Sequence, residues 1–428
     1  MTLTKESTCD CPIQQSPFLN APHTHQVLKP RPKIANNILE CIGNTPLVRL
    51  NSIGKKDGIH CEILAKCEFF NPGGSIKDRI AHRMIQAAEE SGQINKGDKI
   101  IEATSGNTGI GLALASAVKN YGCTIVLPEK MSMEKINVLK ALGANIIRTR
   151  TTANFDDPDS HIEIAKGIQE KDPNHTHLLN QYKNINNPLV HYDKTTMEII
   201  NDCEEILPDM VVISAGTGGT LTGISKGIKK ANPKCIIVGV DPAGSILARN
   251  KVEDEKNRVV TGPYDIEGIG YDFVPNVLDD HDVDFWVKSY DRESFEMSRR
   301  LIREEGLFCG GSCGSAMYCA LLAIKKLNWG SEKRVVVILP DSVRNYMTKF
   351  LLDDWMVSKG HMDLPINDVS IKMSKLNIGK ENPLELKQPK TFKPHVSIHE
   401  FLKVTKSHGI ALNSGTALVT EDGTWGPE

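Results

Sequence analysis

An α/β fold with mainly parallel sheets is the fold class that the sequence predicts. From about residue 38 to residue 357, strand-like apolar runs alternate with helical stretches, an order typical of parallel sheets with helical crossovers. The run at residues 335–339 (VVVIL) is apolar at every position, as expected for a strand covered on both faces. The chain has 428 residues, too many for one compact core, so two or three domains are expected.

The expected elements follow one another in a regular order. Strands are expected at residues 62–67, 99–102, 124–127, 145–148, 210–214, 236–240 and 334–339, where short apolar runs occur. Helices are expected between most of them, at residues 75–90, 107–119, 133–142 and 221–230. The pattern predicts an irregular N-terminal arm over residues 1–37, since prolines at 12, 17, 22, 30 and 32 block long helices and interior strands.

The C-terminal part has a different composition. The main core is expected to span residues 38–358, and residues 359–394 are polar and rich in lysine and proline, which is typical of a linker. Residues 395–428 contain a helix-like segment at 397–408 and a strand-like run at 416–420. Thirty-four residues are too few for a stable core on their own.

Composition narrows the class of protein. The chain is 40% hydrophobic and 24% charged, with a net charge of −2, so no general attraction to nucleic acid or to an anionic membrane is implied. Its eleven cysteines are an odd number and several fall in expected strands, which argues for buried thiols rather than a secreted disulfide framework. No secretory signal opens the chain, and the apolar runs are much shorter than the ~20 residues of a membrane helix. We expect a cytoplasmic protein.

Lys77 is the first candidate catalytic residue. It follows the glycine-rich turn at residues 71–76 and begins an expected helix. An amine in that position can form a Schiff base with a carbonyl cofactor when burial or a positive helix end disfavours its ammonium form. The alternative is a surface lysine that merely starts a helix, and three further glycine-rich loops argue against it.

Two of these loops follow expected strands and open helices. Residues 104–109 (TSGNTG) cluster three hydroxyl groups and an amide at a helix N-terminus, which is an anion site for a phosphate or a substrate carboxylate. Residues 215–220 (AGTGGT) can wrap a phosphate with backbone N–H groups and threonine hydroxyls. This second loop lacks the Gly-Lys-Ser/Thr of a P-loop and the last glycine of the dinucleotide pattern, because residue 221 is leucine. A monophosphate cofactor is therefore expected rather than a nucleotide.

The third loop, residues 309–315 (CGGSCGS), has the composition of a tight strand-to-helix turn. The four segments SIKDR (75–79), TSGNTG, GTGGT and GGS (310–312) occur in this order. Together they resemble the fold-type-II pyridoxal-phosphate enzymes of the cysteine synthase/cystathionine β-synthase family. The resemblance implies a fold like that of the tryptophan synthase β chain, with two three-layer α/β subdomains and the active site between them.

Longer strings place the chain within this family. Residues 65–70 (AKCEFF), 180–182 (NQY), 267–273 (EGIGYDF) and 339–347 (LPDSVRNYM) resemble the cystathionine β-synthases, over roughly residues 22–357. The implied reaction is a β-replacement, a hydro-lyase type of step in transsulfuration, that condenses L-serine with L-homocysteine to L-cystathionine and water. Sulfide release from cysteine is a possible further activity of such an enzyme. A homodimer is implied as well.

The resemblance assigns roles to single residues. The positions matching the family's cofactor-binding residues are Lys77, Asn107, Gly216, Thr217, Gly218, Gly219, Thr220 and Ser312. Lys77 matches the Schiff-base lysine and Asn107 the asparagine that bonds the pyridoxal 3′-oxygen, while the neutral Ser312 hydroxyl faces the pyridine nitrogen. The positions matching the substrate site and its entrance are Thr104, Ser105, Gly106, Thr108, Gln181, Tyr182, Gly268 and Tyr271.

These residue types suit a β-replacement. Once the substrate amine has displaced it, Lys77 is free to remove the α-proton as a base. The cofactor acts as the electron sink. A serine at the pyridine nitrogen cannot keep that nitrogen protonated as a carboxylate would, which favours prompt loss of the β-substituent over transamination.

The N-terminal arm carries a possible haem site. Cys9, Cys11, His23 and His25 lie within it, and cysteine thiolate with histidine suits iron. Animal cystathionine β-synthases bind haem b there, which implies His23 as one ligand and Cys11 as the other, with Cys9 as the rival. The alternative is a tail with incidental cysteines and histidines.

The sequence departs from the family pattern at two places, and each departure leads to a prediction. Some relatives have C-x-x-C where this chain has Asn232 to Cys235, so no redox disulfide is expected there. Full-length relatives carry paired regulatory modules that bind S-adenosylmethionine, and residues 395–428 resemble part of one such module. We expect a truncated regulatory region without activation by S-adenosylmethionine.

Other functions remain open at this point. A cysteine synthase that uses O-acetylserine and sulfide shares Lys77, Asn107, the loop at 216–220 and Ser312, so these residues do not decide. The cysteines and histidines of the N-terminal arm and the longer strings favour a cystathionine β-synthase over a cysteine synthase. A catalytically silent binding protein on the same fold is a further alternative, but a mere scaffold has no chemical need for Lys77.

Overall fold

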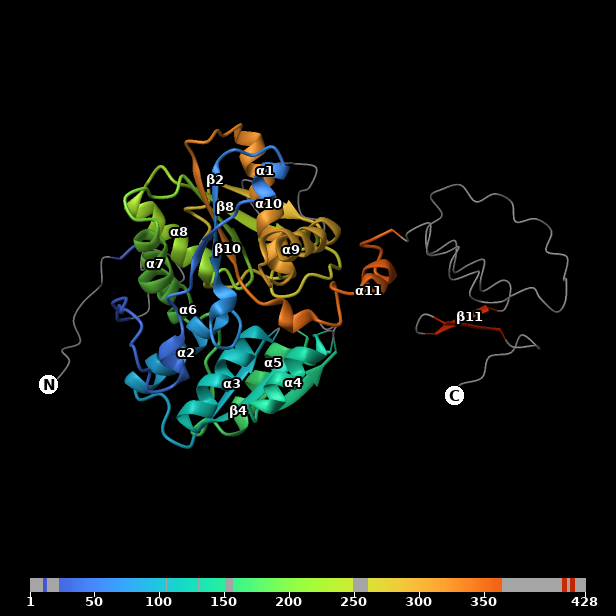
Figure 1. Ribbon diagram of the computed structural model, residues 1–428. Helices are drawn as coiled ribbons and strands as arrows, with labels where there is room; N and C mark the ends of the chain where they lie inside the picture. The colour runs from blue at the N-terminus through green and yellow to red at the C-terminus, as the bar shows by residue number, and fades with distance from the viewer. Residues whose placement is uncertain are drawn as a thin grey trace. The chain divides into compact units, whose positions relative to one another are not determined.

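The computed structural model of the chain describes residues 11–13, 23–104, 106–129, 131–150, 157–248, 261–363, 410–413 and 416–419. It contains two compact units, Met1–Met347 and Thr348–Glu428. The first unit holds two sheets with their helices (Figure 1). The second contains helix α11 (Asp353–Ser358) and the antiparallel strands β11 (Ile410–Asn413) and β12 (Thr416–Val419).

The larger sheet has six strands in the order β1-β2-β10-β7-β8-β9. The strands in this order are β1 (Leu47–Arg49), β2 (Glu62–Cys67), β10 (Arg334–Leu339), β7 (Met210–Ser214), β8 (Ile236–Pro242) and β9 (Phe285–Ser289). All neighbours are parallel except β1, which runs antiparallel to β2.

Helices cover both faces of this sheet. Val335 and Val337 of β10 pack in one apolar cluster with α9 (Asp291–Glu305) and α10 (Gly311–Leu327). Val336 and Ile338 belong to the opposite cluster, with α8 (Gly219–Ala231). Because successive side chains of a strand point to opposite faces, a strand buried on both sides must be apolar throughout. The run VVVIL therefore marked a central strand correctly.

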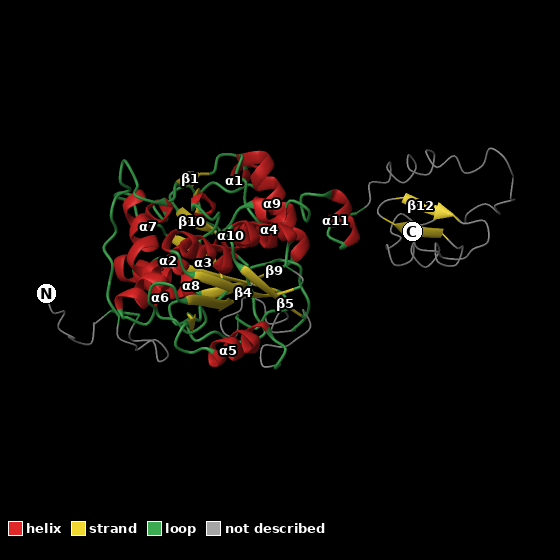
Figure 2. Cartoon of the chain, turned by 90° about the horizontal axis from the view of Figure 1, so that it is seen from below, coloured by secondary structure: helices red, strands yellow, loops and turns green. Residues whose placement is uncertain are grey.

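The smaller sheet has four parallel strands in the order β5-β4-β3-β6. They are β5 (Asn145–Thr149), β4 (Gly122–Pro128), β3 (Lys99–Ala103) and β6 (Thr176–Leu178). Helices α3 (Asn107–Lys119) and α4 (Met133–Ala141) pack on one face, and α5 (His161–Lys171) packs on the other. Figure 2 shows α5 on the opposite side of β4 and β5 from α3 and α4.

The remaining elements join the two sheets. Helix α2 (Lys77–Glu90) packs on α3 and on α6 (Asn186–Val190). A π-helical turn (His191–Thr195) links α6 to α7 (Thr196–Asp202). The short helices are η1 (Ile38–Cys41), α1 (Ile53–Lys56), η2 (Glu68–Phe70) and η5 (Val343–Tyr346).

The predicted fold class is confirmed, with two three-layer α/β assemblies and mainly parallel sheets. All seven strands predicted in this region are present, the helix predicted at 107–119 has the predicted bounds, and the other three predicted helices differ only at their ends. Strands β1, β6 and β9 and several helices were not predicted. The first compact unit includes the described part of the arm and ends at Met347, before the predicted core boundary at residue 358. β12 overlaps the strand expected at 416–420, whereas the helix expected at 397–408 lies outside the described residues.

Two further expectations concern cysteines and membranes. Of the ten cysteines that the structure describes, all except Cys41 are buried. Burial raises the pKa of Cys235 to about 12. Within the described residues, no helix combines the length and the apolar character that crossing a membrane requires.

Candidate active site

The candidate site lies where the carboxyl ends of β3, β7 and β10 meet. Ligands in open α/β sheets bind at this edge. The isolated bridges Ser75–Asp341 and Cys309–Ser342 tie the loop that follows β10 to the segments that precede α2 and α10. A cavity lies among them, lined by Ile76, Lys77, Asn107, Ser214, Gly216, Gly218, Thr220, Gly268, Ile269, Ser312, Ile338, Pro340 and Asp341. Six predicted cofactor residues thus share one cavity.

Lys77 is the first residue of α2. The start of this helix is held against α3, because a Cβ on Gly111 would lie 2.8 Å from Ala81 Cβ and 3.0 Å from the Lys77 carbonyl oxygen. Burial lowers the pKa of Lys77 to about 8. Among the described residues, its amine has no ion-pair or hydrogen-bond partner. A substantial fraction of this amine is therefore neutral near neutral pH, as a nucleophile or base requires.

Asn107 is held from two sides. Its Nδ2 donates a hydrogen bond of 2.8 Å to Asp341 Oδ2, and its Oδ1 accepts one of 3.0 Å from Asn345 Nδ2. Tyr346 also donates from its hydroxyl to Asp341 Oδ2, at 2.5 Å. Burial raises the pKa of Asp341. Asp341 and Asn345 were not predicted as site residues, although both lie in the string at 339–347 that marked the family.

The loop from Gly216 to Thr220 depends on its glycines. A Cβ on Gly216 would lie 2.5 Å from the Gly268 carbonyl oxygen, and one on Gly219 would lie 1.9 Å from Asn187 Oδ1. Gly218 has φ +87°, a left-handed conformation that favours glycine. The loop opens the N-terminus of α8, where the first backbone N–H groups have no partner within the helix. Of the predicted phosphate residues, Gly216, Gly218 and Thr220 line the cavity.

Side chains beneath this loop fix its two threonines. Thr217 Oγ1 accepts a hydrogen bond of 3.0 Å from Asn187 Nδ2. Thr220 Oγ1 lies 3.2 Å from His191 Nε2. Burial lowers the pKa of His191 well below its usual value, so this imidazole is neutral at physiological pH. Asn187 of α6 and His191 of the π-helical turn were not predicted, since no sequence pattern links these elements to the loop.

The predicted carboxylate-binding residues form a second cluster beside Asn107. Thr108 donates from Oγ1 to Gln181 Oε1 at 2.7 Å, and Gln181 Nε2 donates to the Ala103 carbonyl oxygen at 2.9 Å. Thr104 Oγ1 accepts from the Gly106 backbone N–H at 3.1 Å. Thr104, Gly106, Thr108 and Gln181 are thus brought together, but they do not line the cavity around Lys77. Ser105 lies outside the described residues.

The buried carboxyl group of Glu102 supports this cluster. Glu102 accepts hydrogen bonds from the backbone N–H groups of Asn180 and Gln181, at 2.9 and 3.0 Å. Burial raises the pKa of Glu102 to about 8. The two hydrogen bonds to Glu102 fix the turn that carries Gln181 and Tyr182.

The residues predicted at the entrance form an aromatic group. The Tyr182 and Tyr271 hydroxyl oxygens are 3.4 Å apart, and their rings meet edge to face with centroids 5.5 Å apart. Phe273 contacts both rings. Gly268 lines the cavity directly, whereas Tyr182 and Tyr271 do not.

Lys135 of α4 joins two of the site's loops. Its Nζ lies 2.7 Å from Glu267 Oε2, and the two side chains are 0% and 5% exposed. The Lys135 stem packs so closely on Gly106 that a Cβ there would lie 2.6 Å from Lys135 Cδ. This pair connects the smaller sheet's helices to the loop that carries Gly268. Sequence reasoning missed it, because its two partners are far apart along the chain.

Arg79 forms a second buried network beside Lys77. Its guanidinium bonds the carboxylates of Glu68 and Glu198, with four N–O distances of 2.7 Å. Lys66 Nζ lies 3.1 Å from the same Glu198 carboxylate. The network ties the first turn of α2 to η2 and α7.

The described part of the arm brings Cys11 and His23 into contact. Cys11 Sγ lies 3.3 Å from His23 Nε2, and His25 offers a third ligand atom within 4.8 Å of both. Cys11 is buried in an apolar cluster with Ile13 and Leu189. His25 Nδ1 lies 2.5 Å from Asp193 Oδ1. Cys9 lies outside the described residues.

Comparison with known proteins identifies the family. The profile of the family described as pyridoxal-phosphate dependent enzyme matches residues 38–341. The chain belongs to this family. Its fold is that of the fold-type-II members, as the solved structures similar to it indicate.

Named relatives lie within the same family. The chain is 59% identical to the cystathionine beta-synthase of Dictyostelium discoideum over 330 residues, covering 77% of this chain and 64% of the relative. It is 53% identical to that of Mus musculus over 390 residues, covering 91% and 68%. The crystal structure of O-acetyl serine sulfhydrylase isoform 3 from Entamoeba histolytica has a TM-score of 0.66 and 34% identity, covering 77% of this chain and 94% of that one.

The cavity's residues fit the cofactor that gives the family its name. The cavity offers an amine of lowered pKa, a glycine loop at a helix N-terminus, and an asparagine held in position. Ser214 Oγ and Asp341 Oδ1 are buried in the cavity wall without a hydrogen-bond partner. A site that binds a polar ligand typically has buried polar atoms without a partner in the protein. It also has glycines at positions where a Cβ would clash with a neighbour.

Proposed function

We propose that the chain catalyses the β-replacement of L-serine by L-homocysteine, giving L-cystathionine and water. One observation carries the proposal: Lys77, Asn107 and Ser312 border one cavity with three residues of the loop at 216–220. The chain is 53–59% identical to named cystathionine beta-synthases. The identity to a named O-acetyl serine sulfhydrylase is 34%, so the cysteine synthase alternative is not favoured.

Lys77 has two roles in this proposal. Its amine holds pyridoxal phosphate, and after release it accepts the substrate α-proton and returns a proton to the leaving hydroxyl. When bound, the cofactor supplies an electron sink for negative charge at the α-carbon. A pKa of about 8 suits both directions of proton transfer near neutral pH.

The other predicted residues position the reactants. Asn107 is aimed by Asp341 and Asn345, and Ser312 offers a neutral hydroxyl to the pyridine nitrogen. Backbone N–H groups from Gly216 to Thr220 hold the phosphate. We assign Thr104, Ser105, Gly106 and Thr108, with Gln181, to the substrate carboxylate, and Tyr182, Gly268 and Tyr271 to the entrance.

Product analysis tests the reaction. Purified protein is supplied with serine plus homocysteine, and in parallel with O-acetylserine plus sulfide, and the amino-acid products are quantified. We expect cystathionine from the first pair, and no cystathionine from the Lys77→Ala variant. Cysteine as the only product would refute the proposal in favour of a cysteine synthase. Sulfide formed from cysteine plus homocysteine would extend the same chemistry, in the cytoplasm where we place the protein.

We also propose that the arm binds haem b through Cys11 and His23. A buried thiol and an imidazole in contact are the donor set that haem iron takes. His25 is engaged by Asp193 at 2.5 Å, which favours His23. We expect Cys11→Ser and His23→Ala to abolish iron content and the haem absorbance band, while Cys9→Ser retains both. Iron retained in Cys11→Ser but lost in Cys9→Ser would transfer the role to Cys9.

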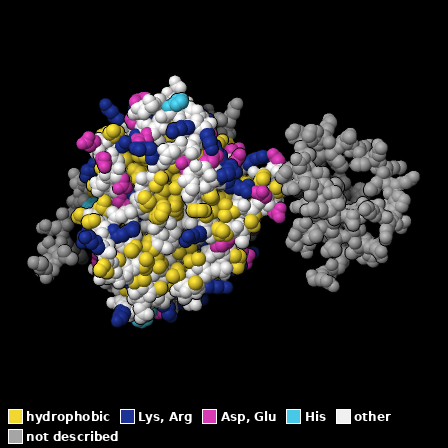
Figure 3. Space-filling view, in the orientation of Figure 1, with side chains coloured by type: hydrophobic (Ala, Val, Ile, Leu, Met, Phe, Trp, Pro, Cys, Tyr) yellow, Lys and Arg dark blue, Asp and Glu magenta, His cyan; other side chains and the backbone are white. Residues whose placement is uncertain are grey.

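A homodimer is the assembly that we propose. The exposed hydrophobic side chains include Phe70 (58%), Phe308 (63%) and Met347 (50%). The segments that carry Phe70 and Phe308 are close together, because Gly74 and Phe308 accept backbone bonds from Ser342 and Val343. Hydrophobic side chains cover much of the middle of one face (Figure 3), as at protein interfaces. We expect Phe308→Glu to yield monomers in sedimentation velocity; an unchanged dimer would place the interface elsewhere.

A further inference from the structure

A second, larger cavity lies outside the candidate active site. Its volume is about 700 Å³, and it lies between residues 24–32 of the arm and the outer surface of α2 and the π-helical turn. We call it the arm pocket. None of the residues that line the active-site cavity lines it. A cavity of this size is typical of a small-molecule site.

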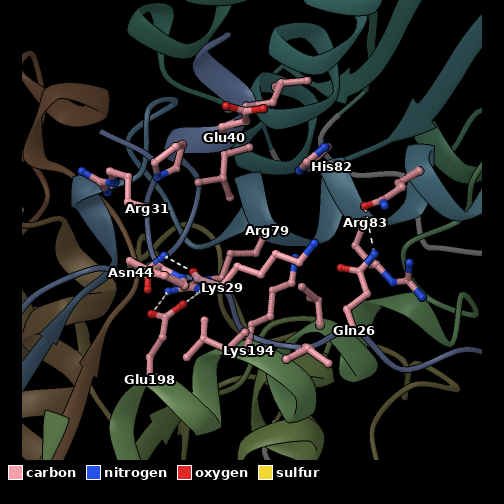
Figure 4. Close-up of a pocket in the computed structure, with 18 of the residues that line it drawn as sticks. Gln26, Lys29, Arg31, Glu40, Asn44, Arg79, His82, Arg83, Lys194 and Glu198 are labelled. Carbon is pink, nitrogen blue, oxygen red and sulfur yellow. Dashed lines mark hydrogen bonds and ion pairs between the residues drawn. The ribbon is translucent and has the colours of Figure 1, made fainter. Parts of the chain in front are cut away.

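Cationic side chains dominate the arm pocket. Five of its lining residues are lysine or arginine and three are glutamate. Figure 4 shows His82, Arg83 and Lys194 around the same space, with Lys29 and Arg31 from the arm. The excess of positive charge indicates an anionic occupant.

The buried carboxylates that attract Arg83 and Lys194, those of Asp193 and Glu198, are bonded by other groups. Lys194 and His82 have no hydrogen bond or ion pair with any described residue. Arg83 has a side chain only 2% exposed. Its Nη2 donates to the Thr24 carbonyl oxygen at 2.8 Å, but Nε and Nη1 have no hydrogen-bond partner. The Glu90 carboxylate is 3.6 Å from Nη1 and 49% exposed, too distant for a hydrogen bond.

Nearby carboxylates are already engaged. Glu198 bonds Arg79 and Lys66, and Glu40 accepts from the backbone and side chain of Asn36. Asp193, next to Lys194, accepts from the Gln26 backbone N–H at 2.8 Å and from His25. Burial lowers the pKa of Lys194, and Arg83 lowers it further. Burial also lowers the pKa of His82 to about 4, with Lys194 adding to the effect. At neutral pH His82 is therefore uncharged, whereas Arg83 and Lys194 are two cations that repel each other. The carboxylates near these two cations are either exposed, as in Glu90, or bonded by other groups, as in Asp193 and Glu198.

We propose that the arm pocket binds a phosphate-bearing small molecule through Arg83, Lys194 and His82. The donors come from two elements, α2 and the π-helical turn, and the several oxygens of a phosphate suit such a set better than a planar carboxylate does. The cavity exceeds one phosphate group, so an organic portion extends toward Lys29 and Arg31. Because Thr24 bonds Arg83 and the arm also carries His23, the ligand would fix the arm on α2.

Calorimetric titration with inorganic pyrophosphate tests this site. The full chain is first saturated with pyridoxal phosphate, so that the loop at 216–220 does not take the probe. We expect pyrophosphate to bind the wild-type protein, and Lys194→Gln to weaken binding at least about tenfold, as for a lost charge-assisted hydrogen bond. His82→Leu is expected to weaken it several-fold, and Lys194→Arg to retain it.

Controls separate this result from general charge effects and from the proposed reaction. Lys171→Gln removes an equal charge from an exposed position on α5, and we expect it to bind pyrophosphate like the wild type. Cystathionine formation without pyrophosphate is expected to be unchanged in Lys194→Gln, so the two proposals fail independently. The proposal is overturned by absence of pyrophosphate binding, by equal binding in Lys194→Gln, or by equal affinity for succinate.

Discussion

Lys77 and Arg79 are two residues apart at the start of α2, and their environments are opposite. Burial opposes the charge of Arg79, yet Glu68 and Glu198 outweigh it and raise the pKa of this guanidinium. Burial acts without such compensation on Lys77 and lowers its pKa to about 8. The same helix turn therefore holds one cation permanently charged and leaves the other partly neutral. The difference is set by carboxylate partners rather than by depth.

Lys135 falls between these two cases. It is fully buried, as Arg79 is, but it pairs with one carboxylate, that of Glu267. Arg79 has two carboxylate partners, Lys135 has one, and Lys77 has none among the described residues. This series separates structural cations from a reactive amine, and each member can be tested by removing its charge.

Removing the amine of Lys77 is expected to have the largest effect, in opposite directions on two measurements. Lys77→Met should reduce cystathionine formation by at least about 10⁴-fold, since anchor and base are both lost. The same change should raise the unfolding free energy of the cofactor-free protein at pH 7 by about 1–3 kcal/mol, because a buried unpaired charge is removed.

The sign of that stability change follows from the lowered pKa. The pKa of Lys77 is 10.5 in the unfolded chain and about 8 in the folded protein. The free-energy cost of burying its ammonium group is therefore complete below pH 8 and vanishes as pH rises toward 10.5. Denaturant unfolding at pH 7 and at pH 10.5 measures it. A Lys77→Met protein that is less stable at pH 7 would contradict the contrast with Arg79.

Replacing Arg79 should act on stability alone. Arg79→Met leaves Glu68 and Glu198 buried without their cation, and we expect a loss of about 3–5 kcal/mol in unfolding free energy. Arg49→Met is the matched control, because Arg49 is 62% exposed and pairs with Glu62 at the surface; its loss should stay below about 1 kcal/mol. Equal losses in the two variants would show that burial of the pair does not matter.

The single pair of Lys135 should give an intermediate result. Lys135→Met leaves the Glu267 carboxylate buried without its cation, and we expect the unfolding free energy to fall by about 2–3 kcal/mol. The double variant Lys135→Met/Glu267→Gln should recover most of this loss. Because Glu267 adjoins Gly268, the single variant should also raise KM for serine more than it lowers kcat. If the double variant were no more stable than Lys135→Met, the proposed contribution of the Lys135–Glu267 pair would be contradicted.

Acid is expected to weaken the Arg79 network gradually, because Glu198 becomes protonated as pH falls. Burial alone would raise the pKa of Glu198, but Arg79 outweighs it and lowers the pKa to about 2. Its contribution is complete above the unfolded value of 4.5 and is lost as pH falls toward 2, at roughly 1 kcal/mol per pH unit. Unfolding curves between pH 5 and pH 3 should show a shallower decline for Glu198→Gln. Parallel curves for the two proteins would contradict this assignment.

Sequence reasoning predicted the elements whose signal is local. Strand β10 was predicted because its residues 335–339 are each buried on one face or the other. The glycine loops were predicted because Gly216, Gly218 and Gly219 meet backbone or side chains too closely for a Cβ. Strand β6 has three residues and β9 mixes polar with apolar positions, so neither stands out as an apolar run. The partners Asp341, Asn187 and His191 were missed because their roles depend on neighbours far along the chain.

By itself, the sequence determined the α/β class, the positions of the central strands along the chain, the glycine loops and the lysine that follows the first of them. Backbone periodicity and the steric need for glycine act over a few residues, so they can be read along the chain. Only the tertiary structure decided which cations are paired, since Arg79 meets Glu198 across 119 positions and Lys135 meets Glu267 across 132. Charge interactions depend on distance through space and on burial, and both are set when the two sheets and their helices pack together.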